Sequence, residues 1–409
     1  MKALLKYIGP GFLLAGAAIG VSHLVQATRA GADYGVILIF AILIACLTKY
    51  PFLEFGSRYA SSTGKNLIEG YRTLGRSYVL IFALITIFTM FIIQAAVTIV
   101  SAGLAEYLFG FGWSNFTWCL VLLIFCILIL LIGKYKKLDL LMKVVVSLLT
   151  ISTLFSVIIA GFQVDFSTIS FNKSSELWTL SGIGFIIALM GWMPIPIDAA
   201  VWHSLWAREK MLQTKYQPNS REARLDFNIG YLSATFLGVL FFLMGLLLMN
   251  GSDIKFASAS VTFSGQLIEM YTQTLGEWSR ILIAFIAFVT MFSTTLTVTD
   301  AFPRVMSKLV QNEKQAQKKL NAYHIFIIII PIIALIILYF LNSTFTVLVD
   351  FAAGLSFLAS PVLAWFNLKL IIQNKNLIKI SPNYVLFSRI CLFFLVCFGL
   401  GYLVFKFLS

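Results

Sequence analysis

The sequence predicts an all-α integral membrane protein made of two inverted repeats, and three observations support this fold class. The 409 residues are 60% hydrophobic and 11% charged, whereas soluble domains are about a quarter charged. The hydrophobic residues fall in eleven segments of membrane-spanning length, which requires about 20 apolar residues each. The first and the sixth of these segments are interrupted near their middles.

The predicted membrane segments are 7–32, 35–56, 78–103, 117–133, 139–162, 179–206, 226–249, 279–303, 323–341, 345–369 and 383–406. A cytoplasmic N-terminus places 23 of the 30 Lys and Arg residues on the cytoplasmic side and 5 on the other. Because basic loops favour the cytoplasm, we expect a multi-pass protein of a bacterial-type plasma or inner membrane with its C-terminus outside. The net charge of +13 therefore reflects membrane orientation, and no nucleic-acid partner is expected.

The sixth segment, 179–206, cannot be one continuous helix, because Gly191, Pro194 and Pro196 lie in its middle. Each proline removes a backbone donor and clashes with the preceding turn, and Asp198 is suited to cap a second half-helix. A break at membrane depth is tolerated where its backbone is buried in protein or lines a water-filled cavity. We favour a binding site over a structural proline kink, because polar residues accompany the break.

The first segment carries Gly16 and Gly20, followed by the polar pair Ser22 and His23. Two small residues at this spacing also form helix-packing faces. Interrupted helices at matching positions in two halves, however, indicate an inverted-repeat transporter with its substrate site between the breaks. We expect a single transmembrane domain over 1–409, with one repeat at 7–162, its inverted copy at 179–369 and an extra helix at 383–406.

Polar side chains near the two breaks form the predicted binding site. Stripes of polar residues at helical spacing on the first, third and eighth segments indicate cavity walls, although Ser and Thr also bond their own helices or neighbouring ones. The predicted substrate-binding residues are Gly20, Ser22, His23, Gln26, Gln94, Met193, Pro196, Asp198 and Thr297.

Ionisable residues inside membrane segments are functional candidates. Asp198 and His203 are the predicted proton-coupling residues, and His23 with Asp198 are the candidate metal ligands. A capping role for Asp198 and a packing role for His203 are the structural alternatives. Close by in the second segment, Lys49 precedes the i, i+4 residues Glu54 and Arg58, and we interpret these as structural or gate-latching ion pairs.

Motifs of other protein classes do not occur in the chain. The sequence contains no P-loop, nucleotide-binding fingerprint, HExxH motif or nucleophile elbow, so neither ATP-driven transport by this chain nor an enzyme is expected. The five cysteines lie in apolar segments without disulfide or zinc spacing, and we expect no cofactor.

The run GPGFLLAGAAIGVSHLVQATRAGADYG at 9–35 resembles the first helix of Nramp transporters, and the runs at 49–71 and VWHS at 201–204 extend the likeness. This resemblance implies the LeuT fold, with eleven helices in a 5+5 inverted repeat, and proton-coupled import of a divalent metal. Family members bind the metal with an Asp-Pro-Gly-Asn run, where this chain has residues 20–23, Gly-Val-Ser-His. The family's methionine ligand aligns with Pro196, although Met193 could replace it.

These replacements disfavour Mn²⁺ and Fe²⁺, since transition metals bind soft or charged ligands, and they favour a hydrated, Mg²⁺-like cation. We therefore expect an Nramp-related secondary active transporter, a symporter that works by alternating access and takes up such a cation or another small solute with protons. The alternative is transport of a small organic solute after loss of the metal site. A membrane sensor, or a metalloenzyme with His23, Asp198 and His203 as ligands, is less favoured. The expected partners are the substrate, protons and the lipid bilayer.

Overall fold

The structure is a computed structural model that describes residues 6–132, 135–164, 169, 177–250, 256–310, 319–340 and 345–408. All regular structure in these ranges is helical, with no strand. The helices are α1 (Pro10–Ala18), the π-helix η2 (Ser22–Ala27), α2 (Thr28–Tyr34), α3 (Leu38–Thr63), α4 (Leu67–Leu74), α5 (Arg76–Phe109), α6 (Asn115–Ile132), α7 (Tyr135–Gln163), α9 (Leu180–Trp192), α10 (Ala199–Thr214), α11 (Ser220–Met249), α12 (Ser260–Leu275), α13 (Ser279–Val310), α14 (Lys319–Phe340), α15 (Phe345–Gln373) and α16 (Pro382–Leu408).

The helices confirm the membrane architecture predicted from composition. In the described part of the chain, eight helices are long and apolar enough to span a membrane, and the bent pair Pro10–Ala18 and Ser22–Tyr34 meets the same test when its two parts are taken together. Two shorter apolar helices cover Ser147–Gln163 and Leu180–Trp192. Each of the eleven predicted segments coincides with a helix or a broken pair of helices, while the number of crossings and the repeat boundaries stay predictions.

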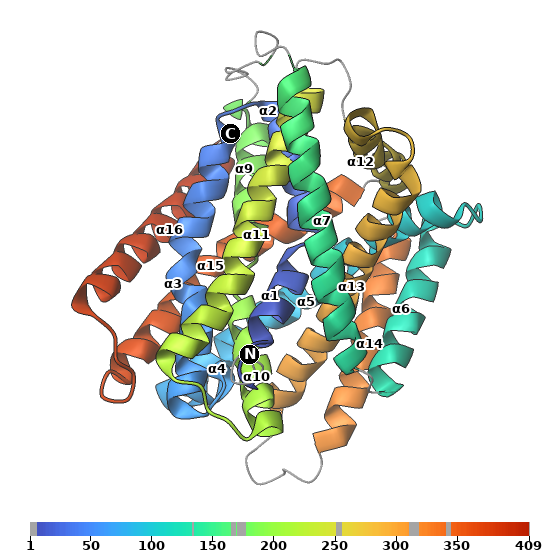
Figure 1. The fold of residues 1–409 in the computed structure, drawn as a ribbon. Helices are drawn as coiled ribbons and strands as arrows, with labels where there is room; N and C mark the ends of the chain where they lie inside the picture. The colour runs from blue at the N-terminus through green and yellow to red at the C-terminus, as the bar shows by residue number, and fades with distance from the viewer. Residues whose placement is uncertain are drawn as a thin grey trace.

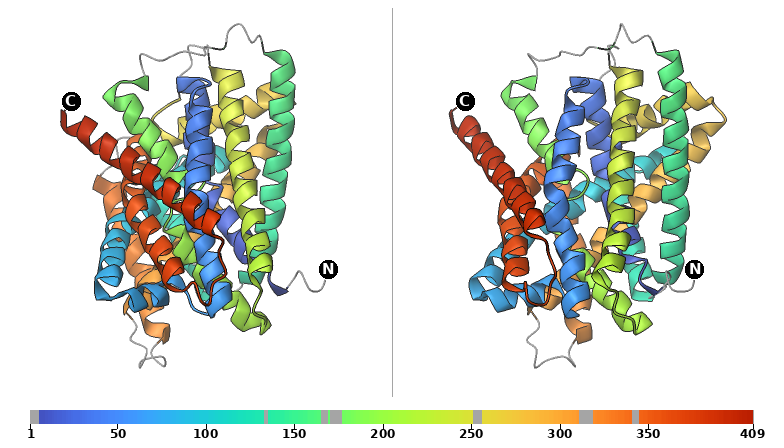
Figure 2. Two further views of the ribbon diagram at one scale, coloured as in Figure 1. Left: turned by 90° about the vertical axis from the view of Figure 1, so that its left-hand side faces the viewer. Right: turned by 60° about the vertical axis from the view of Figure 1, so that its left-hand side comes forward.

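The helix α1 lies in the middle of the bundle, where long helices surround it (Figure 1). It packs against α10, α11 and α13, while α9 packs against α15 and α5 packs against α13. The helix α16 crosses the outside of the bundle obliquely, next to α15 and α3 (Figure 2). The two broken helices are thus enclosed by other helices, as irregular backbone at membrane depth requires.

Glycines allow α1 to lie directly on α11. A Cβ atom on Gly11 would stand 1.9 Å from the carbonyl oxygen of Asp226, and one on Gly230 would stand 1.9 Å from the carbonyl oxygen of Gly11. Any side chain at either position would force the helices apart. The N-terminus of α11 itself is fixed by a capping box between Asn219 and Glu222, which satisfies backbone donors that a helix start leaves unpaired.

Candidate functional site between two broken helices

The first break, residues 19–21, separates α1 from η2 and turns the chain by 46°. Its open carbonyls are satisfied by hydroxyl groups close by. The Ser22 hydroxyl donates to the Ala18 carbonyl at 2.8 Å, and the Thr294 hydroxyl of α13 lies 3.1 Å from the Ile19 carbonyl. Gly20 permits this approach, since a Cβ there would stand 2.7 Å from Thr294 Oγ1. The predicted interruption of the first segment is confirmed.

The second break, residues 193–198, separates α9 from α10. Met193 is extended, with φ −88° and ψ 126°, and the helix resumes at Ala199. The predicted interruption is confirmed, but the predicted cap is wrong. Asp198 has helical backbone angles and its side chain makes no capping hydrogen bond, because a capping side chain reaches the next turn from extended backbone.

A small cavity of about 30 Å³ lies between the two breaks, and we call it the central cavity. It is lined by Ala17, Ala18, Val21, Ser22, Ile93, Val97, Trp192, Pro194, Ile195, Pro196, Trp202, Thr294 and Val298. Its walls therefore come from both broken helices together with α5 and α13. The lining side chains are apolar or aromatic except for two hydroxyl groups, and none is ionisable. This volume is enough for very few water molecules.

The structure places two of the predicted binding residues, Ser22 and Pro196, on the wall of the central cavity. His23 lies behind the wall and is fully buried. Its Nε2 lies 2.8 Å from the Ala234 carbonyl of α11, and its Nδ1 lies 2.7 Å from the Ser22 hydroxyl. A carbonyl partner requires the proton on Nε2. His23 therefore holds η2 against α11 through its Nε2–H group, while its Nδ1 and the Ala18 carbonyl share the single hydroxyl hydrogen of Ser22.

Met193 and His23 meet at one place on α11. A Cβ on Gly238 would stand 2.9 Å from the Met193 sulfur and 3.6 Å from Cδ2 of His23. Both side chains are fully buried. Two residues from opposite breaks are thus brought together, but outside the set that lines the central cavity.

Two further candidates, Gln94 and Thr297, lie on the helices that surround the cavity. Gln94 of α5 donates to Thr98 at 3.2 Å and accepts from Thr299 of α13 at 3.3 Å. Thr297 donates to the Ser293 carbonyl of its own helix at 2.8 Å. Within the pairs described, the polar stripes of α5 and α13 thus bond each other or their own helices. Polar side chains in membranes often bond their own helix or a neighbouring one in this way, which is the alternative to a role as cavity walls.

Gln26 belongs to the C-terminal half of the first broken helix, which is the outer half in the predicted orientation. Its Nε2 donates to Asp350 Oδ1 of α15 at 2.7 Å. Arg29, one turn further along, donates to both oxygens of Asp350 at 2.9 and 3.2 Å. Asp350 is therefore bound by two residues of this helix, and we call the three residues the outer latch.

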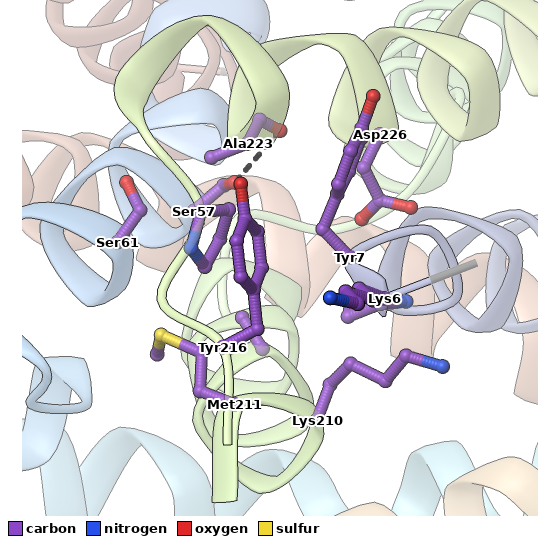
Figure 3. Close-up of a pocket in the computed structure, with 12 residues that line it drawn as sticks. Lys6, Tyr7, Ser57, Ser61, Lys210, Met211, Tyr216, Ala223 and Asp226 are labelled. Atoms are coloured by element: carbon purple, nitrogen blue, oxygen red, sulfur yellow. Dashed lines mark hydrogen bonds between the residues drawn. The ribbon is translucent and has the colours of Figure 1, made fainter. Parts of the chain in front are cut away.

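The opposite end of the broken helix is held by Asp226. Its two carboxylate oxygens accept from the backbone N–H groups of Gly9 and Gly11 at 2.9 and 2.8 Å, where the helix dipole favours negative charge. We call this contact the inner latch. It lines a narrow pocket of about 10 Å³, where Lys6 and Lys210 lie on the same side as Asp226 (Figure 3). The first broken helix is therefore bound at both of its ends, by the inner latch and by the outer latch.

His203 and Asp198 are both almost fully buried, but they lie at different places. His203 Nε2 is 3.8 Å from Asp226 Oδ2, too long for a hydrogen bond, and neither ring nitrogen has a hydrogen-bond partner. Asp198 has one carboxylate oxygen, Oδ1, without a partner. The structure therefore brings His203 to the inner latch and leaves Asp198 at the second break.

Lys49 was not predicted as a site residue, and its predicted role as part of an ion-pair group is wrong. Glu54 and Arg58 do form the expected pair at 2.8 Å. The Lys49 ammonium instead reaches the second break, where it donates to the carbonyls of Gly191 and Ile195 at 2.8 and 3.1 Å. Its position within an apolar span was the available signal, since such a charge needs a polar partner inside the protein.

Comparisons with known proteins agree with this architecture. Residues 11–405 match the family model described as natural resistance-associated macrophage protein-like, Nramp. The chain is 34% identical over 400 residues to the uncharacterized protein PM0681 of Pasteurella multocida, covering 96% of this chain and 90% of that protein. It is 25% identical over 272 residues to the divalent metal cation transporter MntH of Staphylococcus aureus, covering 64% of this chain and 58% of that one.

Solved structures show the same fold. A mutant of the Eremococcus coleocola manganese transporter aligns with a TM-score of 0.71 at 16% identity, over 98% of this chain and 86% of that chain. MhsT in complex with L-phenylalanine aligns with a TM-score of 0.65 at 15% identity, over 96% and 97% of the two chains. The match over nearly the whole chain decides the family. This chain belongs to the Nramp family of membrane transporters and is not an enzyme.

Proposed function

We propose that the protein is a secondary active transporter that works by alternating access, with the central cavity as its substrate site. The observation that carries this proposal is the position of the cavity between the two broken helices, with a separate latch at each end. A substrate held there would be released to one side when one latch opens while the other stays closed. Such broken helices supply backbone groups to substrates in many transporters.

For the substrate, we propose a divalent cation that keeps part of its water shell, as Mg²⁺ does, taken up together with protons. The relative named as a divalent metal cation transporter supports the substrate class. The cavity walls carry the hydroxyl groups of Ser22 and Thr294 and no thioether, and hard cations prefer oxygen ligands. Asp198 and His203, buried with unpartnered polar atoms, are the proposed proton carriers.

A small organic solute is the second candidate, and two observations favour it. Trp192 and Trp202 line the cavity, as aromatic side chains do in many small-molecule sites. Within the described residues, no group of three or more His, Cys, Asp or Glu side chains gathers to hold a metal. We further propose that the N-terminus lies in the cytoplasm and the C-terminus outside, in a bacterial-type inner membrane.

The test is uptake by purified protein in liposomes. Saturable Mg²⁺ uptake that is stimulated by an inward proton gradient would support the cation proposal, with Asp198→Asn and His203→Gln each removing the stimulation. Uptake of organic solutes without any divalent cation would favour the second candidate. Ligand binding without flux of any solute tested would contradict transport.

A further inference from the structure

A buried cation of the protein itself occupies the second break. Lys49 lies in α3, within an apolar span, and none of its surface is exposed. Its ammonium donates to the Gly191 carbonyl at 2.8 Å and to the Ile195 carbonyl at 3.1 Å. One side chain of α3 thus bridges the end of α9 and the unwound residues that follow it.

These two carbonyls form a natural cation site. Gly191 lies in the last turn of α9, where carbonyls have no partner within the helix and the helix dipole is negative. Ile195 lies between Pro194 and Pro196, in backbone that forms no helix. Unwound carbonyls and half-helix C-terminal ends coordinate cations in other transporters. Here both oxygens already face a positive charge.

A carboxyl group, that of Asp198, lies at the same break as the Lys49 side chain. Asp198, at the far end of the break, is close enough to interact electrostatically with Lys49. Ile195, one of the two acceptors, also lines the central cavity next to Trp192 and Pro194. A cation entering the cavity would therefore reach Ile195, whose carbonyl oxygen already accepts a hydrogen bond from Lys49.

We propose that Lys49 is a specificity-determining residue, a resident cation that keeps dehydrated divalent metal ions off the carbonyls of Gly191 and Ile195. The proposal rests on the central cavity being the substrate site. Repulsion between an ammonium and a dication in a poorly solvated site disfavours binding by more than about tenfold. A cation that keeps its water shell, or an organic solute, needs neither carbonyl and is affected less.

The test is Mn²⁺ binding to the full-length protein in detergent, measured by titration calorimetry. Lys49→Met removes the charge and keeps an apolar chain of similar length, so we expect it to bind Mn²⁺ at least about tenfold more tightly than the wild type. Lys65→Met, at an exposed position outside the helices, is the matched control and should bind as the wild type does. Equal Mn²⁺ affinity in Lys49→Met and the wild type would overturn the proposal.

A second variant covers the case in which Lys49→Met does not fold. Lys49→Gln keeps an N–H donor for the carbonyls and removes only the charge, so it should show the same gain in Mn²⁺ affinity. If neither variant gives monodisperse protein, Lys49 is a structural residue and the proposal is overturned. Liposome uptake is measured separately. Tighter Mn²⁺ binding without uptake of any solute would support this inference while contradicting the proposed function.

Discussion

The two broken helices differ in how their open backbone is satisfied. The first break spans residues 19–21, and hydroxyl groups of Ser22 and Thr294 bond its carbonyls. The second spans residues 193–198, and Lys49 of α3 donates to the Ile195 carbonyl within it and to the Gly191 carbonyl in the turn before it. The hydrogen bond from Ser22 lies within the bend and can re-form as the bend changes, whereas the Lys49 side chain ties two carbonyls of the second broken helix to α3. We therefore expect the first broken helix to move during transport and the second to stay fixed against α3.

The largest effect is expected where the second broken helix touches α15. A Cβ on Gly191 would stand 2.0 Å from the Ala353 carbonyl oxygen, whereas one on Gly184, in the same helix, would meet nothing within 4 Å. Gly191→Ala should lower stability by about 1–3 kcal/mol because a backbone contact cannot yield. Gly184→Ala should raise it by about 0.5–1 kcal/mol. Thermal unfolding in detergent measures both, and equal midpoints would contradict the tight packing.

The inner latch should control access from the cytoplasmic side. Asp226→Asn weakens two charge-assisted hydrogen bonds to the start of α1, each worth about 1.5–3 kcal/mol. We expect alkylation of Ser61→Cys, which lines the same pocket as Asp226, to become about tenfold faster, in a background where the exposed Cys397 is replaced by serine. Glu209→Gln on α10 is the control. An unchanged alkylation rate would show that α1 is held by packing alone.

The outer latch should give a smaller effect, because its charges are partly exposed. The side chains of Arg29 and Asp350 are 13% and 30% exposed, and such pairs contribute about 1 kcal/mol or less. Asp350→Asn should therefore raise labelling of Ser22→Cys from outside only several-fold. As the control, Glu277→Gln breaks an exposed ion pair with Arg280 and should leave the labelling rate of Ser22→Cys unchanged. A response as large as that of the inner latch would mean that the first broken helix pivots about its outer end.

The smallest effect on stability is expected from variants that each remove one hydroxyl group, at Ser22 or at Thr297. Ser22→Ala removes a bond to a carbonyl opened by the first break and should cost about 1 kcal/mol. Thr297→Val removes a bond within a continuous helix, whose carbonyls are already paired, and should change stability and uptake little. If Thr297→Val reduced uptake more than Ser22→Ala does, Thr297 would belong to the substrate site.

The sequence predicts the broken helices well because proline and glycine act on their own backbone. Neither the interruption at Pro194 and Pro196 nor the one beside Gly20 needs tertiary information. The direction in which each side chain points does need tertiary information, since a broken helix has no constant number of residues per turn. His23 therefore contacts α11 instead of the cavity, and Lys49 bonds the second break instead of an acidic neighbour.

The central claim is that the two breaks face each other across the transport cavity, and a cysteine pair tests it most directly. Ser22 and Ile195 both line the cavity, one from each break. Oxidation of Ser22→Cys with Ile195→Cys should cross-link the pair and stop uptake until a reductant is added. The pair Ser22→Cys with Gly184→Cys should not react. Full uptake under oxidising conditions without any cross-link in the first pair would contradict the claim.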